Sequence, residues 1–206
     1  MSAAISDILW ASERNIERVD NLVKIYRDQL GGSGSGRKPV NSTDLLRAAV
    51  VFLHSTVEDF LREIAQLRLP FAAEGVINGV PLAGLRGRPE KFFLGKLTNF
   101  RGITVDELLE KSVAEYLDRF TVNNIPELER LLEWLDLTPD GIDDYKKHLG
   151  ELMERRHHIV HQADKSTTTG RGTHRTRSIR VSQIDEWTWA VKDLISDIAS
   201  AFEDNS

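Results

Sequence analysis

Apolar residues recur every three or four positions along most of the chain, a spacing that predicts amphipathic α-helices. The first such segment covers residues 3–30. The second follows three candidate N-cap residues at 41–43 and stops before Pro70. Because the second segment carries a wide apolar stripe, we expect it to be the central core helix.

Two more long helices are predicted in the second half of the chain. Thr138 and Pro139 are the residue types favoured at an N-cap and at the first helical position, and the helix that they open is expected to continue to about Ala163. Ser182 and Asp185 resemble a capping box, and the apolar pattern after them predicts a last helix.

Shorter helices are expected between the second and third long ones. The stretch KFFLGKL is the first of them. Thr104 and Glu107 form a capping box before the next, and another runs over about 126–135. The only strand-like pattern is a short extended piece around 179–181.

These patterns predict a single all-α domain over residues 1–206, a bundle of six to seven helices. A flexible loop rich in glycine and serine at 31–43 and a polar, basic loop at 165–181 interrupt the helices. The length of 206 residues favours one domain and allows a sizeable core.

The composition is that of an ordinary globular protein, with 40% apolar and 29% charged residues. No run approaches the ~20 apolar residues that a membrane-spanning helix needs, and the N-terminus has no signal-peptide pattern. The chain has no cysteine, which excludes disulfides and thiolate zinc sites. We therefore expect a cytoplasmic protein that does not associate with membranes.

Charge is unevenly distributed along the sequence. Residues 155–180 contain seven basic residues and one acid, a net charge of +6. Because the whole chain has a net charge of −5, the other residues together carry −11. A local basic patch on an acidic protein indicates a specific anion contact rather than general attraction to polyanions.

The helix before the basic loop contains the sequence MERRHHIVHQAD at 153–164, with two arginines and three of the six histidines. On a helical wheel at about 100° per residue, Arg156 falls in the middle of an apolar stripe. Such an arginine needs an acidic partner, a bound anion or an interface. The stripe consists of Leu149, Leu152, Ile159, Val160 and Ala163.

Three interpretations of this helix are open. In the first, Arg156 pairs with a buried carboxylate and the histidines are exposed. In the second, histidines bind a metal ion, since His157 and His161 are spaced i, i+4, and Glu154, His158 and His161 share one face. In the third, arginine and histidine bind and cleave a phosphodiester.

The third interpretation needs only two kinds of side chain. The guanidinium fork matches phosphate, and histidine titrates near neutral pH and moves a proton. In RNA cleavage a base removes the ribose 2′-proton, an acid protonates the leaving 5′-oxygen and a cation stabilises the phosphorane. No metal or other cofactor is required.

The positions of Arg156 and His161 restrict this chemistry, because they lie about 140° apart on a straight helix. Either the helix ends or bends near Val160, or two copies meet in a two-fold dimer. A dimer would also explain an arginine on an apolar stripe, since the stripe would then be an interface.

The sequence resembles the HEPN superfamily, whose signature is R-x(4–6)-H. The match is Arg156-x4-His161, and the surrounding sequence RRHHIVHQAD is similar to that of the RiboL-PSP-HEPN branch. LLRAAVVFLHSTVEDFLR at 45–62 and LTNFRGITVDELL at 97–109 also resemble that branch. The resemblance implies an α-helical and usually dimeric protein, in a superfamily with many metal-independent endoribonucleases.

The resemblance also implies roles for individual residues. Arg156 takes the position of the phosphate-binding arginine that stabilises the transition state, and His161 that of the catalytic base or acid. His157 occupies the polar position after the arginine, often asparagine in the superfamily, and supports the site or joins the proton transfer. Arg155 is a second candidate arginine, with R-x5-H spacing.

Further residues are expected to support the site. Glu58 is expected as an ion-pair partner for an arginine, and Asp164 as a helix-end acid that could orient His161. Basic residues are expected to hold the RNA backbone: Arg155, Lys165, Arg171, Arg175 and Arg177.

The function implied is a homodimeric endoribonuclease that cleaves single-stranded RNA through 2′-OH attack and leaves 2′,3′-cyclic phosphate ends. A prokaryotic toxin–antitoxin or antiviral defence system is the implied setting, with an antitoxin protein as a further partner. The alternative is a non-catalytic HEPN dimer that binds RNA or a nucleotide, or acts as an interaction module. A purely structural helical protein is the third class.

Overall fold

The structure is a computed structural model, and it describes residues 3–30, 43–84, 94–139, 141–166 and 176–204. Nearly all of these residues belong to helices or to short connections between them. Within these ranges, no helix combines the length and the apolar character that crossing a bilayer requires.

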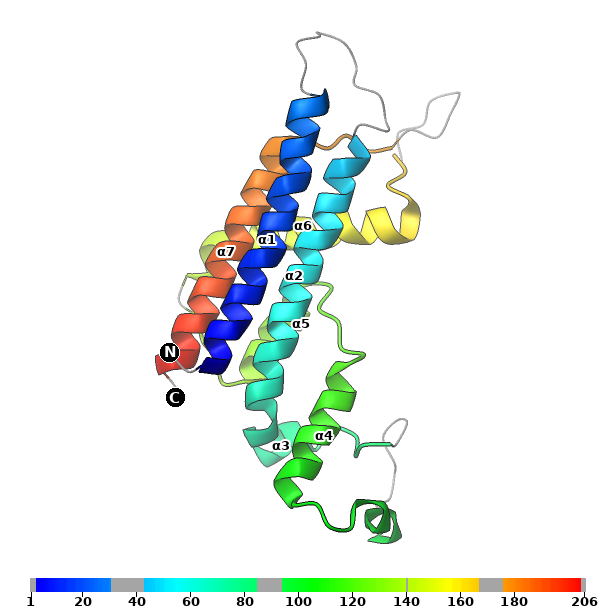
Figure 1. Ribbon diagram of the computed structural model, residues 1–206, viewed down its shortest axis with the longest axis vertical. Coiled ribbons are helices and arrows are strands. Elements are labelled where there is room, and N and C mark those ends of the chain that lie inside the picture. The colour runs from blue at the N-terminus through cyan, green and yellow to red at the C-terminus, as the bar shows by residue number, and fades with distance from the viewer. Residues whose placement is uncertain (1–2, 31–42, 85–93, 140, 167–175, 205–206) are drawn as a thin grey trace.

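Three long helices run side by side along the long axis of the molecule, and a fourth crosses them (Figure 1). The three side-by-side helices are α1 (Ala3–Leu30), α2 (Asp44–Arg68) and α7 (Val181–Asp204), and α1 runs antiparallel to the other two (Figure 1). The crossing helix is α6 (Ile142–Gln162), which packs against both α2 and α7. Its C-terminal half emerges beyond α2 (Figure 1).

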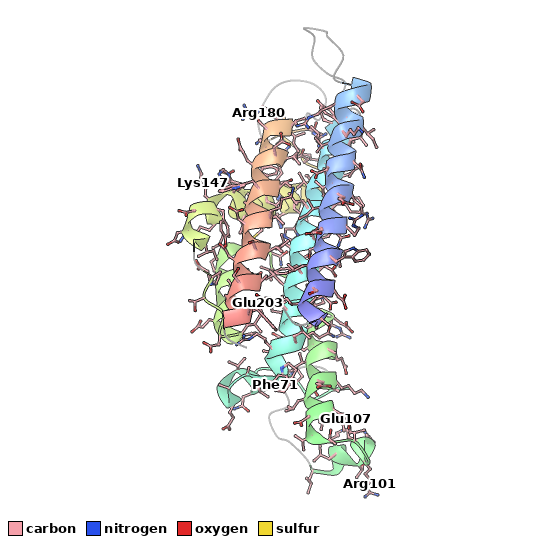
Figure 2. The ribbon with its side chains drawn as sticks, turned by 60° about the vertical axis from the view of Figure 1, so that its left-hand side comes forward. Phe71, Arg101, Glu107, Lys147, Arg180 and Glu203 are labelled. Carbon is pink, nitrogen blue, oxygen red and sulfur yellow. The ribbon has the colours of Figure 1, made fainter. Side chains whose placement is uncertain are left out.

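Most of the shorter helices lie at or beyond the C-terminal end of α2, whereas α5 lies level with α2 and contacts α6 (Figure 1). The far tip carries Arg101 and Glu107, well away from the three long helices (Figure 2). The elements are η2 (Leu69–Phe71), α3 (Glu74–Ile77), η3 (Leu94–Phe100), α4 (Val105–Leu117) and α5 (Ile125–Trp134).

The all-α prediction is confirmed. The described residues form seven α-helices and two 3-10 helices, and their only bridge is an isolated pairing of Lys165 with Thr176. Part of the stretch KFFLGKL lies outside the described residues, and its remainder belongs to the 3-10 helix η3. The predicted capping box of α4 is present, with Thr104 and Glu107 bonded to each other in both directions.

Two predicted helix starts are wrong. α6 begins at Ile142, three residues after Pro139, because Gly141 adopts a left-handed conformation with φ of 84° and ends the preceding turn there. α7 begins at Val181, one residue before the expected N-cap Ser182, and residues 179–180 of the expected extended piece belong to neither a helix nor a strand.

The predicted capping box at the start of α7 is also absent. Ser182 lies inside the helix, and the side chain of Gln183 accepts the hydrogen bond from the backbone N–H of Arg180 (3.1 Å). Asp185 instead pairs with Arg27 of α1 at 2.9 Å. The first turn of α7 is therefore fixed by a glutamine and by a contact between helices.

Helix α2 is central to the core, as predicted, because it packs against α1, α4, α6 and α7. Its periodic apolar side chains lie in one continuous buried cluster with those of its neighbours. Burial of this surface supplies most of the free energy that holds the bundle together. The fully buried side chains of α2 include Leu46, Leu53, Phe60, Leu61 and Ile64.

A buried ion cluster joins the end of α6 to the start of α2. The chain leaves α6 through Ala163 and Asp164, both left-handed (φ 49° and 54°), and the Asp164 N–H bonds the carbonyl of His158 (2.9 Å). The Asp164 carboxylate, 1% exposed, accepts from Arg47 Nε at 2.7 Å and from Arg155 Nη2 at 2.8 Å. Both arginines are almost covered as well.

The same cluster fixes the chain that follows the basic loop. The backbone carbonyl of Arg177 accepts from Arg47 (2.9 Å) and from Arg155 (3.2 Å), while its N–H donates to the carbonyl of Asp164 (2.8 Å). Segments from three parts of the chain therefore meet at one carboxylate.

Removing the charge at this cluster should destabilise the whole domain. Asp164→Asn keeps a residue that tolerates the left-handed conformation, but it leaves the covered Arg155 without a carboxylate and Arg47 with only that of the exposed Asp44 (3.1 Å). We expect the free energy of unfolding, measured in urea, to fall by about 3–5 kcal/mol. Asp185→Asn, which breaks the half-exposed pair with Arg27, should cost less than about 1 kcal/mol. If both variants lost the same free energy of unfolding, the buried Asp164 cluster would not be the stabilising contact that we infer.

Candidate active site on helix α6

Arg156 lies in the second half of α6 with 20% of its side chain exposed. Its Nη2 atom lies 3.8 Å from Oε2 of Glu58 on α2, and Nη1 donates to Oδ1 of Asn123 at 3.4 Å. The arginine on the apolar stripe thus has an acidic partner, as the first interpretation requires. Both contacts are long and the guanidinium is partly accessible, so it can also approach a ligand.

Glu58 is held between Arg156 and a buried histidine. His54, one turn earlier on α2 and 1% exposed, places Nδ1 at 3.4 Å from Oε2 of Glu58. Burial alone would raise the pKa of Glu58, but His54 and the Arg156 guanidinium outweigh that effect and hold the pKa below its ordinary value. Glu58 is therefore ionised near neutral pH and fixes the position of the arginine.

Histidine side chains gather at the C-terminal end of α6. His161 is exposed in the last turn, and its ring centroid lies 4.9 Å from that of the exposed His157. His158 is more covered, with Nδ1 2.9 Å from Oε1 of Gln162 and Nε2 3.3 Å from Oε1 of Glu154. His157 and His161 are therefore the pair available to a ligand.

The structure does not bring Arg156 and His161 of one chain together. Arg156 contacts Glu58 and Asn123, and no hydrogen bond or ring contact joins it to His161 among the residues described. α6 stays helical through Gln162, so no bend at Val160 turns the histidine toward the arginine.

The remaining basic candidates differ in their accessibility. Arg155, 11% exposed, is bonded to Asp164 and to the carbonyl of Arg177, so its guanidinium is a structural group rather than a free phosphate ligand. Burial lowers its pKa, and Asp164 opposes that effect. Lys165 is exposed beside the site.

Other expected contacts take a different form. The Asp164 carboxylate contacts Arg47 and Arg155 rather than His161. It therefore supports the site indirectly, by fixing the C-terminal end of α6, and does not orient His161 by direct contact. The half-buried Arg177 joins the structure through its backbone. Arg171 and Arg175 lie outside the described residues.

The metal interpretation depends on three ligands converging. Within the described ranges, no group of three or more histidine, aspartate or glutamate side chains is arranged to hold a metal ion. Glu154 and His158 contact each other, but His161 packs against His157 instead.

Sequence reasoning misses two residues of this region. Asn123 lies between α4 and α5, with no periodicity or motif to mark it, yet it contacts Arg156. Arg47 lies in the first turn of α2, where its buried pairing with Asp164 would have required the tertiary fold. The i, i+4 spacing of His54 and Glu58 does indicate that they share a face.

An all-α bundle whose long sixth helix ends in Arg-x4-His has the architecture of a HEPN domain. The family model for RiboL-PSP-HEPN matches residues 13–204, nearly the whole chain, and the protein belongs to this family. No curated protein and no solved structure matches the chain significantly. Nucleases are common in the superfamily to which the family belongs.

The contacts of Glu58 with His54 and with Arg156 should make stability depend on pH in a defined direction. Because the folded-state pKa of Glu58 is below the ordinary 4.5, its stabilisation is fully present above that value and is lost as pH falls through the lower folded pKa. We expect the difference in unfolding free energy between wild type and Glu58→Gln to shrink between about pH 5 and pH 3. A difference that stays constant over this range in urea titrations would contradict the assignment.

Proposed function

We propose that this protein is a metal-independent endoribonuclease that cleaves single-stranded RNA through attack by the ribose 2′-OH. The observation that carries the proposal is the position of Arg156, which is held by Glu58 and Asn123 yet still partly accessible. Membership of the RiboL-PSP-HEPN family supports the proposal, because the superfamily commonly contains nucleases and RNA-binding domains.

In the proposed reaction Arg156 binds the scissile phosphate and stabilises the charge that develops on it. His161 transfers a proton, either from the 2′-OH or to the leaving 5′-oxygen. His157, whose ring lies against that of His161, takes part in the same proton transfer. The products are a 2′,3′-cyclic phosphate and a free 5′-hydroxyl, so the proton removed from the 2′-oxygen is balanced by the one given to the leaving group.

The proposal includes a two-fold dimer in which the C-terminal halves of two α6 helices meet. Arg156 and His161 of one chain make no contact, so a second chain supplies the missing half of each site. Val160, between them in the sequence, is 49% exposed, as expected of an apolar side chain that a partner covers. Many HEPN domains dimerise, which supports this arrangement.

For the biological setting we propose a prokaryotic toxin–antitoxin or antiviral defence system, with an antitoxin protein as a partner. The support is the family membership alone. The exposed Lys165 would contribute to RNA binding. The basic residues at 171 and 175, which lie outside the described residues, would extend the same contact.

Substitution of either central residue should stop RNA cleavage while the fold persists. We expect His161→Ala to lower the cleavage rate by about 10²–10⁴-fold and Arg156→Ala by about 10²–10³-fold. Because the contacts of Arg156 are long and partly exposed, its loss should cost only about 1 kcal/mol of stability. Cleavage of a labelled single-stranded RNA, with circular dichroism for folding, measures both effects.

The matched control is His148→Ala, a histidine in the first half of the same helix that should retain full activity. Wild type should cleave equally well in EDTA, which separates this proposal from a metal-dependent one. A wild type that binds RNA but never cuts it would favour a non-catalytic HEPN module instead.

The dimer can be tested at Val160. We expect the wild type, of 23.3 kDa per chain, to sediment as a dimer and Val160→Glu to sediment as an inactive monomer, because a charge would enter the interface. Val105→Glu, at an exposed valine on α4, is the matched control and should stay dimeric. A wild type that is monomeric at concentrations where it cleaves RNA would overturn the dimer.

A further inference from the structure

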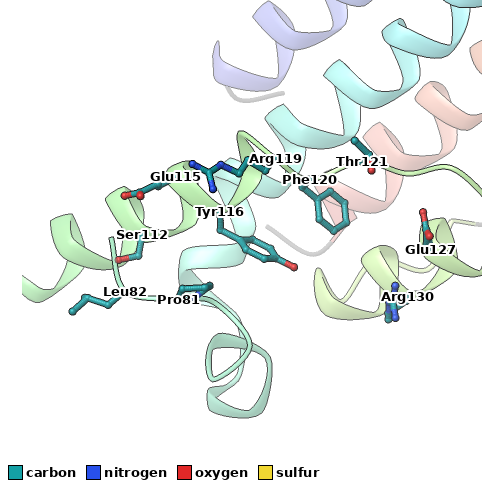
Figure 3. Close-up of a pocket in the computed structure, with 10 residues that line it drawn as sticks. All are labelled: Pro81, Leu82, Ser112, Glu115, Tyr116, Arg119, Phe120, Thr121, Glu127 and Arg130. Atoms are coloured by element: carbon teal, nitrogen blue, oxygen red, sulfur yellow. The ribbon is translucent and has the colours of Figure 1, made fainter. Parts of the chain in front are cut away.

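A cavity of about 380 Å³ lies between α4 and α5, separate from the Arg156 contacts. This volume falls within the ~300–1,000 Å³ typical of small-molecule sites. The rings of Tyr116 and Phe120 are directed into the gap from the end of α4, with Glu127 and Arg130 of α5 on the other side (Figure 3). The two ring centroids are 5.9 Å apart.

Two arginines of the cavity lining have no acidic partner among the residues described. Arg119 is exposed at the end of α4, and Arg130 is exposed with its guanidinium 5.8 Å from the ring centroid of Trp134. Six of the eleven other arginines among the described residues contact a carboxylate, as Arg27 and Arg62 do. The cavity thus presents to an anionic ligand two exposed guanidinium groups that no carboxylate of the described residues contacts, in a lining that also holds Glu115 and Glu127.

The carboxylates of the lining already bind backbone groups. Oε2 of Glu115 accepts from the N–H of Gly84 (2.7 Å), and Oε2 of Glu127 accepts from the N–H of Asn123 (2.8 Å). These contacts fix the cavity wall.

Asn123 connects this cavity to the candidate active site. Its Nδ2 atom donates to Oγ1 of Thr121, which lines the cavity, at 2.9 Å. Its Oδ1 atom accepts from Arg156. A single amide side chain therefore separates the wall of the cavity from the guanidinium that is proposed to bind the scissile phosphate.

We propose that the cavity between α4 and α5 is a binding subsite for a nucleotide of the RNA strand next to the cleaved bond. Its base stacks on Phe120 or Tyr116, and the phosphates on either side of it are held by Arg119 and by Arg130, which lie on opposite sides of the two rings (Figure 3). This inference rests on the proposed function for the identity of its ligand. It assigns RNA contacts to α4 and α5, outside the R-x4-H helix.

The test measures binding of a fluorescent five-nucleotide 2′-O-methyl RNA by anisotropy, because this probe lacks the nucleophile and cannot be cleaved. We expect Arg119→Ala/Arg130→Ala to raise the Kd about tenfold or more, and to lower the slope of log Kd against log salt by about 1.4, the value for two lost contacts to a single strand. Phe120→Leu keeps an apolar side chain for packing but removes the ring, and should raise the Kd at least about fivefold.

The matched control is Arg14→Ala/Lys147→Ala, which removes the same two charges from exposed positions on α1 and α6; Lys147 projects away from the bundle (Figure 2). It should change the Kd less than about twofold. Pocket variants that bind like wild type, or a wild type that does not bind the probe, would overturn the subsite.

The probe also separates the two proposals. If the pocket variants lose binding while wild type fails to cut ordinary RNA, the cavity stands as an RNA-binding site but the nuclease proposal fails. If wild type cuts RNA and the pocket variants bind the probe unchanged, the nuclease proposal stands and the subsite proposal fails.

Discussion

The buried carboxylate of Asp164 sets the geometry on which the candidate site depends. It binds Arg47 at the start of α2 and Arg155 near the end of α6, so these two helices are fixed at one point. A second contact, between Glu58 and Arg156, joins the same helices further along α2. Two such contacts determine the register of α6 against α2. That register leaves His161 in an exposed last turn and Arg156 facing the 121–124 segment.

Neighbouring arginines on α6 consequently have different roles. The Arg155 guanidinium is almost covered and its hydrogen bonds go to Asp164 and the Arg177 carbonyl, which makes it part of the fold. Arg156, one residue later, has an ionised partner in Glu58 but keeps an exposed surface. A phosphate at Arg156 would bring the site a negative charge without breaking the buried cluster. Stability and ligand binding therefore depend on separate residues.

Sequence reasoning is most successful where a periodic pattern decides the structure. Apolar spacing predicts α1 and α2 closely, and the all-α class with them. It fails at the starts of α6 and α7, where Gly141 and Gln183 control the turns rather than the favoured capping types. The wheel marks Arg156 as unusual, but only the tertiary fold reveals Asn123 as its partner.

The proposed nuclease function depends on one chemical step, the attack of the ribose 2′-oxygen on the phosphate bound by Arg156. The most direct measurement uses an RNA that the wild type cuts at a mapped bond, with a single 2′-deoxy nucleotide placed on the 5′ side of that bond. We expect cleavage at that bond to disappear, while the unmodified RNA yields a 2′,3′-cyclic phosphate. Continued cleavage at the deoxy position would contradict the account, because no internal nucleophile would then be present.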